Sequence, residues 1–184
     1  MVQLLKSKIE GLDNKNSESL KDLNKYLGAA IFIVRDDARS VSPIQPEYVK
    51  AISTLSDIQE SKETDFDKKK ASILSAINTL IADKEKWNDG KPDVDELMYG
   101  KSKVSKMNEL EFELLMVEQN NIDFFKERES HLPSQPHDRL SSHMLIHFSG
   151  NNVNISYISS DLPESIKDEI NSMLPKIGLT PQQK

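Results

Sequence analysis

The sequence predicts an α+β fold that is predominantly helical, with a helical body, a C-terminal β-hairpin and a terminal helix packed on it. Two observations support this. Apolar residues recur at intervals of three and four through most of residues 17–129, the spacing of amphipathic helices. Two alternating segments, HMLIHFS and VNISYIS, then flank Gly150-Asn151-Asn152, a strand-turn-strand pattern whose turn residues tolerate positive φ.

The first predicted helix spans about residues 17–40, after the caps Asn16 and Ser17. Its apolar stripe contains Leu20, Leu23, Leu27, Ala30, Ile31 and Val34. The run AIFIV within it also fits a short buried strand, because periodicity does not separate the two over so few residues.

Proline and capping residues predict where the next helices begin. Pro43 and Pro46 end the first helix, and Pro46 suits the first position of a second one. Thr64 or Asp65 caps a third helix, a short helix covers residues 93–99, and the longest runs from Ser105 to about Glu129. We expect Ile77 and Leu114, on the apolar stripes of two of these helices, to be buried.

The helical periodicity of residues 17–129 does not continue into the C-terminal part of the sequence. The hairpin is predicted at about residues 143–159, and Asp161 caps a final helix whose first turn holds Pro163. The tail LTPQQK is predicted to fray. We expect a single domain over residues 1–184, comprising a helical part at 1–129 and the hairpin with its helix at 143–178.

Composition narrows the function classes. The 24 basic and 30 acidic residues give a net charge of -6, which repels phosphate backbones, so we expect no nucleic-acid ligand. Cysteine is absent, which excludes disulfides, thiolate metal sites and cysteine nucleophiles. The longest apolar run, LGAAIFIV, is well short of the roughly 20 residues of a membrane span. We therefore expect a soluble, cytoplasmic protein with no cofactor.

All four histidines, the residues that most often bind metals, fall between positions 131 and 147. In a strand, however, His143 and His147 stand roughly 13 Å apart, too far to share one metal ion. The pair His137-Asp138 resembles the dipeptide of metal-dependent phosphohydrolases, but it follows Pro136 in a predicted loop. We therefore interpret His131, His137, His143 and His147 as surface or half-buried residues, with a metal or acid-base site as the alternative.

Other candidate sites have simpler explanations. Asp36 and Asp37, flanked by Arg35 and Arg39, fit local ion pairs at the end of a helix. The acidic segment containing Asp89, Asp93, Asp95 and Glu96 does not have the calcium-loop spacing, which needs Gly at position 6 and Glu at position 12. The six glycines are scattered and form no phosphate-binding loop.

The long helix carries more apolar residues than one inward stripe buries. Phe112 and Met116 fall off its main face, which fits either a wide stripe packed on two sides or an exposed patch that binds another protein. Trp87 lies at the end of a predicted helix. It either covers the hydrophobic core as a lid or binds another protein as an interface anchor. If the patch is exposed, replacing Phe112 and Met116 by Ser leaves the thermal midpoint nearly unchanged and weakens partner binding.

These observations favour a non-enzymatic protein that binds another protein through the long helix or the hairpin edge: an adaptor, a chaperone-like subunit or an inhibitor. The composition is similar to that of bacterial secretion chaperones and adaptors, a likeness of composition and not of motif. Two alternatives stay open. One is a metal-dependent hydrolase using His137, Asp138, His143 and His147, and the other is a self-associating component that forms a homodimer through the long helix.

Overall fold

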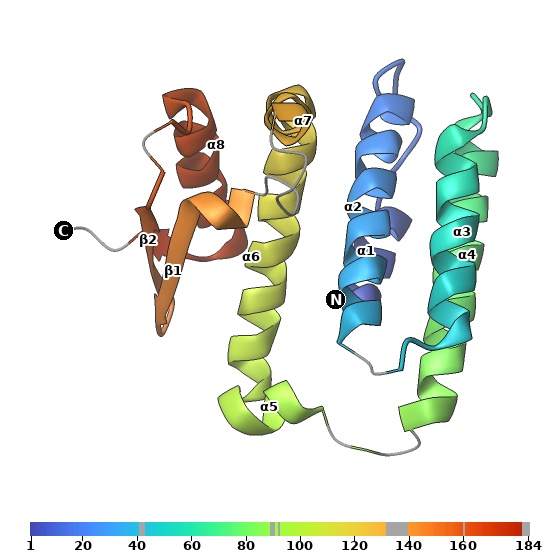
Figure 1. Cartoon of the computed structure of the whole chain (residues 1–184), viewed down its shortest axis with the longest axis horizontal. Helices are drawn as coiled ribbons and strands as arrows, with labels where there is room; N and C mark the ends of the chain where they lie inside the picture. Colours follow the sequence, from blue (N-terminus) through green and yellow to red (C-terminus); the bar gives the residue numbers. More distant parts are fainter. Residues whose placement is uncertain (41–42, 89–90, 92, 132–139, 160, 182–184) are drawn as a thin grey trace. The chain divides into compact units, whose positions relative to one another are not determined.

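The computed structural model describes residues 1–40, 43–88, 91, 93–131, 140–159 and 161–181. The chain divides into two compact units, residues 1–97 and 98–184 (Figure 1). The first contains α1 (Val2–Glu10), α2 (Ser19–Arg39), α3 (Pro46–Glu60) and α4 (Phe66–Asn88), and the short helix α5 (Val94–Tyr99) crosses the boundary between the units.

The second unit holds the small sheet. Its elements are α6 (Lys101–Asn120), α7 (Ile122–His131), the 3-10 turn η1 (Leu140–His143), β1 (Met144–Ser149), β2 (Asn152–Tyr157), α8 (Glu164–Met173), the 3-10 turn η2 (Leu174–Ile177) and β3 (Thr180–Pro181). This arrangement confirms the predicted α+β, mostly helical class with a C-terminal hairpin.

Unit 1 is a bundle of four helices around one core. α2 packs on α3, α3 on α4, and α1 lies against both α2 and α4. The residues that fill this core come from all four helices and recur at helical spacing. They include Leu5, Ile9, Leu23, Leu27, Leu55, Ile73, Ile77 and Leu80.

Local signals set the ends of these helices as the sequence predicts. Pro46 is the first residue of α3. Asp65 precedes α4, and its Oδ1 accepts a hydrogen bond of 2.9 Å from the Lys68 N–H. The run AIFIV lies inside α2 and is helical, because its residues extend the stripe of Leu23 and Leu27. Helix α1, with Leu5 and Ile9 buried, was missed, because the N-terminal apolar run is short.

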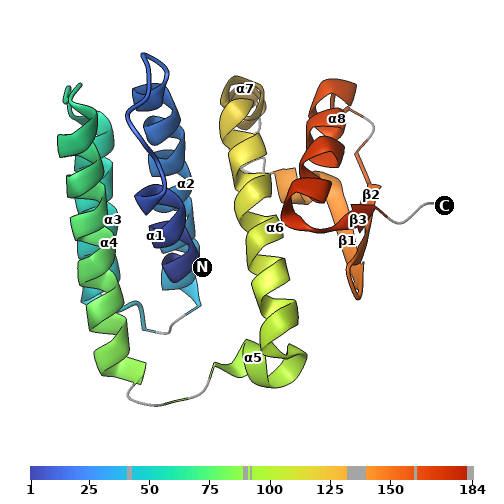
Figure 2. The same ribbon diagram turned by 180° about the vertical axis from the view of Figure 1, so that it is seen from behind.

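The sheet of unit 2 has the order β1-β2-β3. β1 and β2 form the predicted antiparallel hairpin around a two-residue turn at Gly150 and Asn151, with Ser149 paired to Asn152. Gly150 has φ of +60°, as this turn requires. β3 pairs in parallel with β2 after α8 and η2, and these elements are drawn in orange to red in Figure 2.

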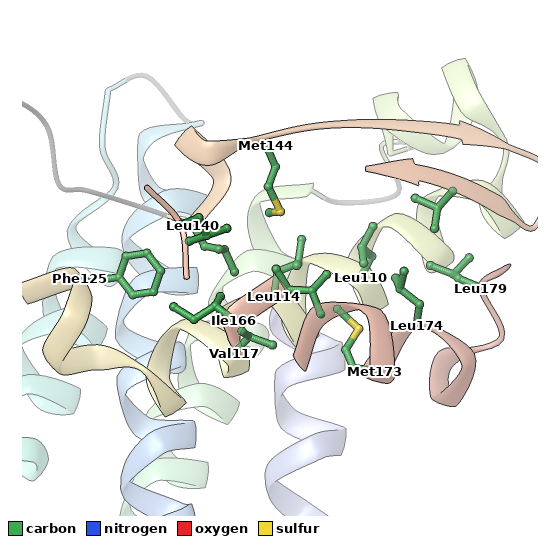
Figure 3. Packing of buried hydrophobic residues seen from close by; sticks show 13 residues of the cluster. Leu110, Leu114, Val117, Phe125, Leu140, Met144, Ile166, Met173, Leu174 and Leu179 are labelled. Carbon is green, nitrogen blue, oxygen red and sulfur yellow. The ribbon is translucent and has the colours of Figure 1, made fainter. Parts of the chain in front are cut away.

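One hydrophobic cluster joins the helices of unit 2 to its sheet (Figure 3). Leu110, Leu114 and Val117 come from α6, Met144 from β1 and Ile170 from α8. α6 and α7, which the sequence analysis grouped with the N-terminal helices, therefore share their core with the hairpin and α8. A hairpin is marginal by itself, so this packing stabilises the strands.

The long helix predicted for residues 105–129 is two helices. α6 ends at Asn120 and α7 begins at Ile122. Between them, Asn121 has φ of -120° and ψ of 32°, and its side-chain amide donates to the Val117 carbonyl and to Glu169 of α8. These side-chain bonds accompany the backbone bond from the Asn121 N–H to the Val117 carbonyl at 3.2 Å, and the helix is interrupted by the dihedral angles of Asn121.

Two expectations at the C-terminus were also wrong. Pro163, and not Asp161, precedes the first residue of α8, so Asp161 does not cap this helix. The first residues of the tail that was predicted to fray are paired, because the Thr180 N–H donates to the Asn151 carbonyl at 2.9 Å and β3 pairs with β2, while residues 182–184 lie outside the described residues. Gly178, with φ of +75°, makes the turn that leads into this strand.

The predicted single domain over residues 1–184 stays a prediction, although the chain forms two compact units. Within the part that the structure describes, every helix is too short or too polar to cross a bilayer.

The two cores predict separate effects on stability. Ile77 and Leu114 are both buried, in unit 1 and unit 2 respectively. Ala at either position should lower the free energy of unfolding by about 2–5 kcal/mol, because a cavity remains where the side chain was. Chemical denaturation measures this. Val49→Ala on the exposed side of α3 is the control and should change the stability by about 0.5 kcal/mol or less. Equal effects of all three variants would contradict the assigned cores.

Candidate functional site

Trp87 lies in the last turn of α4, half-buried against the ring of Tyr48 from α3. The two ring centroids are 5.6 Å apart and the rings are tilted by 41°. Tyr48 itself is fully buried. Trp87 therefore covers part of the unit 1 core, and its predicted role as an interface anchor is not tested by this placement.

Asp37 of α2 accepts two hydrogen bonds at the same place. Its Oδ2 lies 2.6 Å from the Tyr48 hydroxyl and 2.5 Å from Nζ of Lys84 in α4. The interpretation of Asp37 as part of a local ion-paired turn is therefore wrong. The carboxylate reaches across to two other helices, because Tyr48 and Lys84 bring two donors to it.

This cluster of Asp37, Tyr48, Lys84 and Trp87 fastens α2, α3 and α4 together. Burial, followed by the hydrogen bond to Asp37 and the charge of that carboxylate, raises the pKa of Tyr48 well above its usual value. The phenol is thus protonated at every physiological pH. A protonated phenol and a carboxylate that already holds two donors are suited to a structural role and not to proton transfer near neutrality.

The structure separates the histidines that it describes. The His143 ring is buried and lies edge-on to Phe125, with ring centroids 6.3 Å apart, whereas His147 is exposed on β1. His137 and Asp138 lie outside the described residues, as does the side chain of His131. Among the residues described, no group of three or more His, Asp or Glu side chains is arranged to hold a metal ion.

His143, Asp161 and Ser159 lie close together, but their order differs from that of a catalytic triad. Asp161 Oδ1 accepts from the Ser159 hydroxyl and lies 3.7 Å from Nδ1 of His143. In a triad the imidazole stands between the carboxylate and the hydroxyl and removes the hydroxyl proton. Here the carboxylate stands between them, so the arrangement links the start of α8 to the start of β1.

The acidic segment before α6 includes a helix cap. Asp93 Oδ1 accepts a hydrogen bond of 3.1 Å from the Glu96 N–H at the start of α5. Asp89 lies outside the described residues. This hydrogen bond gives Asp93 a role as a helix cap, which explains its position without a bound calcium ion.

The Phe112 side chain is 0% exposed, which agrees with the first of the two interpretations of the long helix, a wide stripe packed on two sides. α6 is buried over a wide arc that includes Leu110, Phe112, Leu114, Leu115 and Val117, so the wide-stripe interpretation fits better than an exposed patch. Met116 is half-buried. Phe112 and Met116 belong to unit 2 and Trp87 to unit 1. Their protein-binding role stays a prediction, but Phe112→Ser should now destabilise the fold, because it removes a buried ring.

The outer edge of β1 is the feature best suited to contact another molecule. Ile158 N–H donates to the His143 carbonyl at 2.9 Å, which extends the β1-β2 ladder by one hydrogen-bonded pair. Hydrogen-bonding residues alternate along antiparallel strands. Met144, Ile146 and Phe148 therefore direct their backbone N–H and C=O groups away from β2, and no described strand pairs with them.

This edge lacks the usual protection. Natural edge strands are blunted by Lys, Pro, a bulge or short length. β1 has six residues, contains neither Lys nor Pro, and keeps an unbroken register with β2. Beside the edge, Leu145 and Ile158 are exposed by 62% and 60%, on the sheet face that the alternation directs away from Met144 and Val153.

In comparisons with protein-family models, curated proteins and solved structures, the chain matches none of them. The function is therefore inferred from the geometry of the chain itself.

The sequence predicts the hairpin edge as a possible contact surface but singles out none of its residues. The absence of charge and proline from MLIHFS was the available signal. It was not decisive, because only the strand order shows which of the two hairpin strands is left at the edge.

The raised pKa of Tyr48 predicts how the contribution of this residue to stability changes with pH. Tyr48→Phe should lower the free energy of unfolding by about 1–2 kcal/mol below pH 9, because the hydrogen bond to Asp37 is lost. Above the ordinary tyrosine pKa of 10.0, the unfolded chain loses the phenol proton while the folded chain keeps it. The contribution of Tyr48 therefore falls as the pH rises, and the difference between wild type and variant should shrink.

Urea denaturation of both proteins between pH 8 and 11 measures this difference, within the range where each still folds. A difference that stays constant or grows with pH would contradict the assigned environment of Tyr48.

Proposed function

We propose that this chain is a non-enzymatic protein-binding protein that captures an extended segment of another protein by adding it as a strand to β1. The observation that carries the proposal is the free edge of β1, where Met144, Ile146 and Phe148 present backbone donors and acceptors. Strand addition uses such backbone groups for affinity and neighbouring side-chain pockets for specificity.

The rigidity of the edge supports this function. Met144 is anchored in the cluster of unit 2, and Ile155 and Phe148 pack against that cluster. The strand is thus held in an extended conformation before a partner arrives. A preformed site lowers the entropic cost of binding for the protein, so most of the ordering falls on the incoming segment.

The chemistry of the surface indicates what the segment looks like. β1 contains no Asp, Glu, Lys or Arg, and Leu145 and Ile158 expose apolar surface beside it. A segment with alternating apolar side chains fits this edge. The net charge of -6 favours basic residues elsewhere on the partner and opposes pairing between two copies of the chain. We therefore assign the edge to another protein, and treat a homodimer as the competing outcome.

Such a protein would act as an adaptor, a chaperone-like subunit or an inhibitor. The acidic, cysteine-free composition supports a role in the cytoplasm of a bacterium, including service to a secretion system. Only the composition supports the bacterial cytoplasm, whereas the structure supports binding at the outer edge of β1. Binding at this edge is therefore the part of the proposal to test first.

The substitution Ile146→Pro tests the edge. Proline removes the outward N–H and places its ring at the edge, but it leaves the β1-β2 hydrogen bonds in place, since these come from the residues on either side of Ile146. Binding of a partner captured by the wild-type chain, identified and then purified, should weaken about tenfold or more. Ile146→Thr is the matched control, because it shortens the same side chain and keeps the N–H.

Amide hydrogen exchange of the complex gives the second readout. The amides of Met144, Ile146 and Phe148 should gain protection on binding, while those of Leu145 and His147, already bonded to β2, should change little. Protection confined to other elements, or full binding by the Ile146→Pro variant, would refute strand addition. The same alternating protection in the isolated protein at high concentration would assign the edge to a second copy.

A further inference from the structure

Glu47, in the first turn of α3, has a carboxylate oxygen that is buried and lacks a hydrogen-bond donor. The side chain as a whole is half-buried, but its Oε2 is shielded from solvent. Within the described part of the chain, no group donates a hydrogen bond to Glu47 and no cation forms an ion pair with it. Removal of water from a charged oxygen is unfavourable unless another donor replaces the water. The position therefore favours a ligand that brings a donor and a positive charge.

The lysines on the turns around Glu47 do not neutralise it. Lys84 of α4 donates to the Asp37 carboxylate at 2.5 Å, so its charge is already engaged. Lys50 lies three residues after Glu47 on α3, but it is exposed and forms no described ion pair with it. The negative charge of Glu47 is thus left without a partner among the described side chains.

Glu47 lines a groove of about 800 Å³ between α3 and α4, which is within the size range of small-molecule sites. Tyr48 contacts both Trp87 and Lys84, which shows that the start of α3 lies beside the end of α4. Asp83 lines the same groove. Glu47 and Asp83 therefore lie at the same end of it.

The charges of the groove wall are unevenly distributed along it. At the end that contains Glu47, Asp83 has a described ion-pair contact of 3.8 Å with the exposed Lys86. Lys68 and Lys69 belong to the first turn of α4. They are roughly 20 Å from Asp83 along the helix axis, at about 1.5 Å per residue. The end with the two carboxylates is thus the part of the groove suited to a cation.

Hydroxyl groups in the groove wall present acceptors and not donors. Thr54, Ser72 and Thr79 each donate their hydroxyl proton to the carbonyl four residues earlier, at 2.9, 3.0 and 2.9 Å. A hydroxyl has a single proton to donate and two lone pairs that accept. The oxygens of these three side chains are therefore left to accept from a ligand, which favours a ligand rich in N–H groups.

An organic ammonium ion fits this wall better than a metal ion. Among the described residues, no three His, Asp or Glu side chains are arranged to bind a metal. A primary ammonium group instead offers three N–H donors that can be shared between a carboxylate and hydroxyl oxygens. Ala51, Ala76 and Leu80 also line the groove and offer apolar contacts to a carbon chain.

We propose that the groove between α3 and α4 binds a small organic cation through its primary ammonium group, with Glu47 as the principal acceptor and Asp83 adding to the negative field. The competing explanation is that the N-terminal dipole of α3 stabilises the Glu47 carboxylate and that the groove contains water alone. The site belongs to unit 1 and is independent of the β1 edge, which belongs to the other unit.

Chemical-shift titration of the full chain with n-butylammonium chloride tests the site, with sodium chloride holding the ionic strength constant. We expect saturable shifts mainly of amides in residues 47–58 and 72–83. Tetramethylammonium chloride is the matched ligand control, because it carries the same charge but has no N–H group. It should bind about tenfold more weakly or not at all.

Glu47→Gln should weaken n-butylammonium binding about tenfold or more, because the charge-assisted hydrogen bond is lost. Glu60→Gln is the matched control, since it makes the same change at an exposed position of α3 outside the groove. It should leave the affinity within about twofold, because an exposed charge is screened by solvent.

Four results would overturn the proposal: no saturable shifts with n-butylammonium, equal binding of the two cations, equal losses in the two variants, or unchanged binding by Glu47→Gln. The dispersion of the same spectra shows whether each variant is folded. If Glu47→Gln does not fold, the comparison of the two cations on the wild-type chain still decides between the ammonium site and the competing explanation.

Discussion

Burial of Leu110, Leu114 and Ile170 in one cluster is the constraint on which unit 2 depends. Two short strands gain little stability by themselves, so the hairpin persists only while its inner side chains are packed on α6 and α8. The same packing fixes which face of β1 is buried, and the strand order leaves the outer edge of β1 without a neighbour among the described strands. The proposed binding edge is therefore a product of the core beneath it, and any loss of the core would also remove the edge.

The charge of Asp37 shows how unit 1 accommodates a polar group between its helices. Asp37 collects donors from Tyr48 and Lys84, so a charge near the ends of three helices is stabilised by the fold itself. Removal of either donor would leave the carboxylate less well compensated, so this cluster holds the three helices together.

Local signals accounted for much of the secondary structure. Pro46, Asp65 and the apolar stripe through Leu23 and Leu27 set helices whose ends agree closely with those observed. The hairpin followed from alternation around Gly150. Errors arose where distant residues intervened. Asn121 interrupts the long helix partly because Glu169 of α8 accepts its amide proton, and β3 forms because Thr180 meets Asn151. The sequence left open whether Phe112 is buried, because helical spacing cannot show how wide the buried arc becomes.

The sequence by itself determined most of the helical segments, the β1-β2 hairpin, the net charge and the absence of cysteine chemistry, because these depend on residues close together in the chain or on composition alone. Tertiary structure decided which groups meet: Asp37 with Lys84, 47 positions apart, and β2 with the C-terminal β3. It also decided that the outer edge of β1 stays unpaired among the described strands. Exposure and partnership are properties of the packed chain, since they depend on neighbours that come from distant parts of the sequence as well as from the same element.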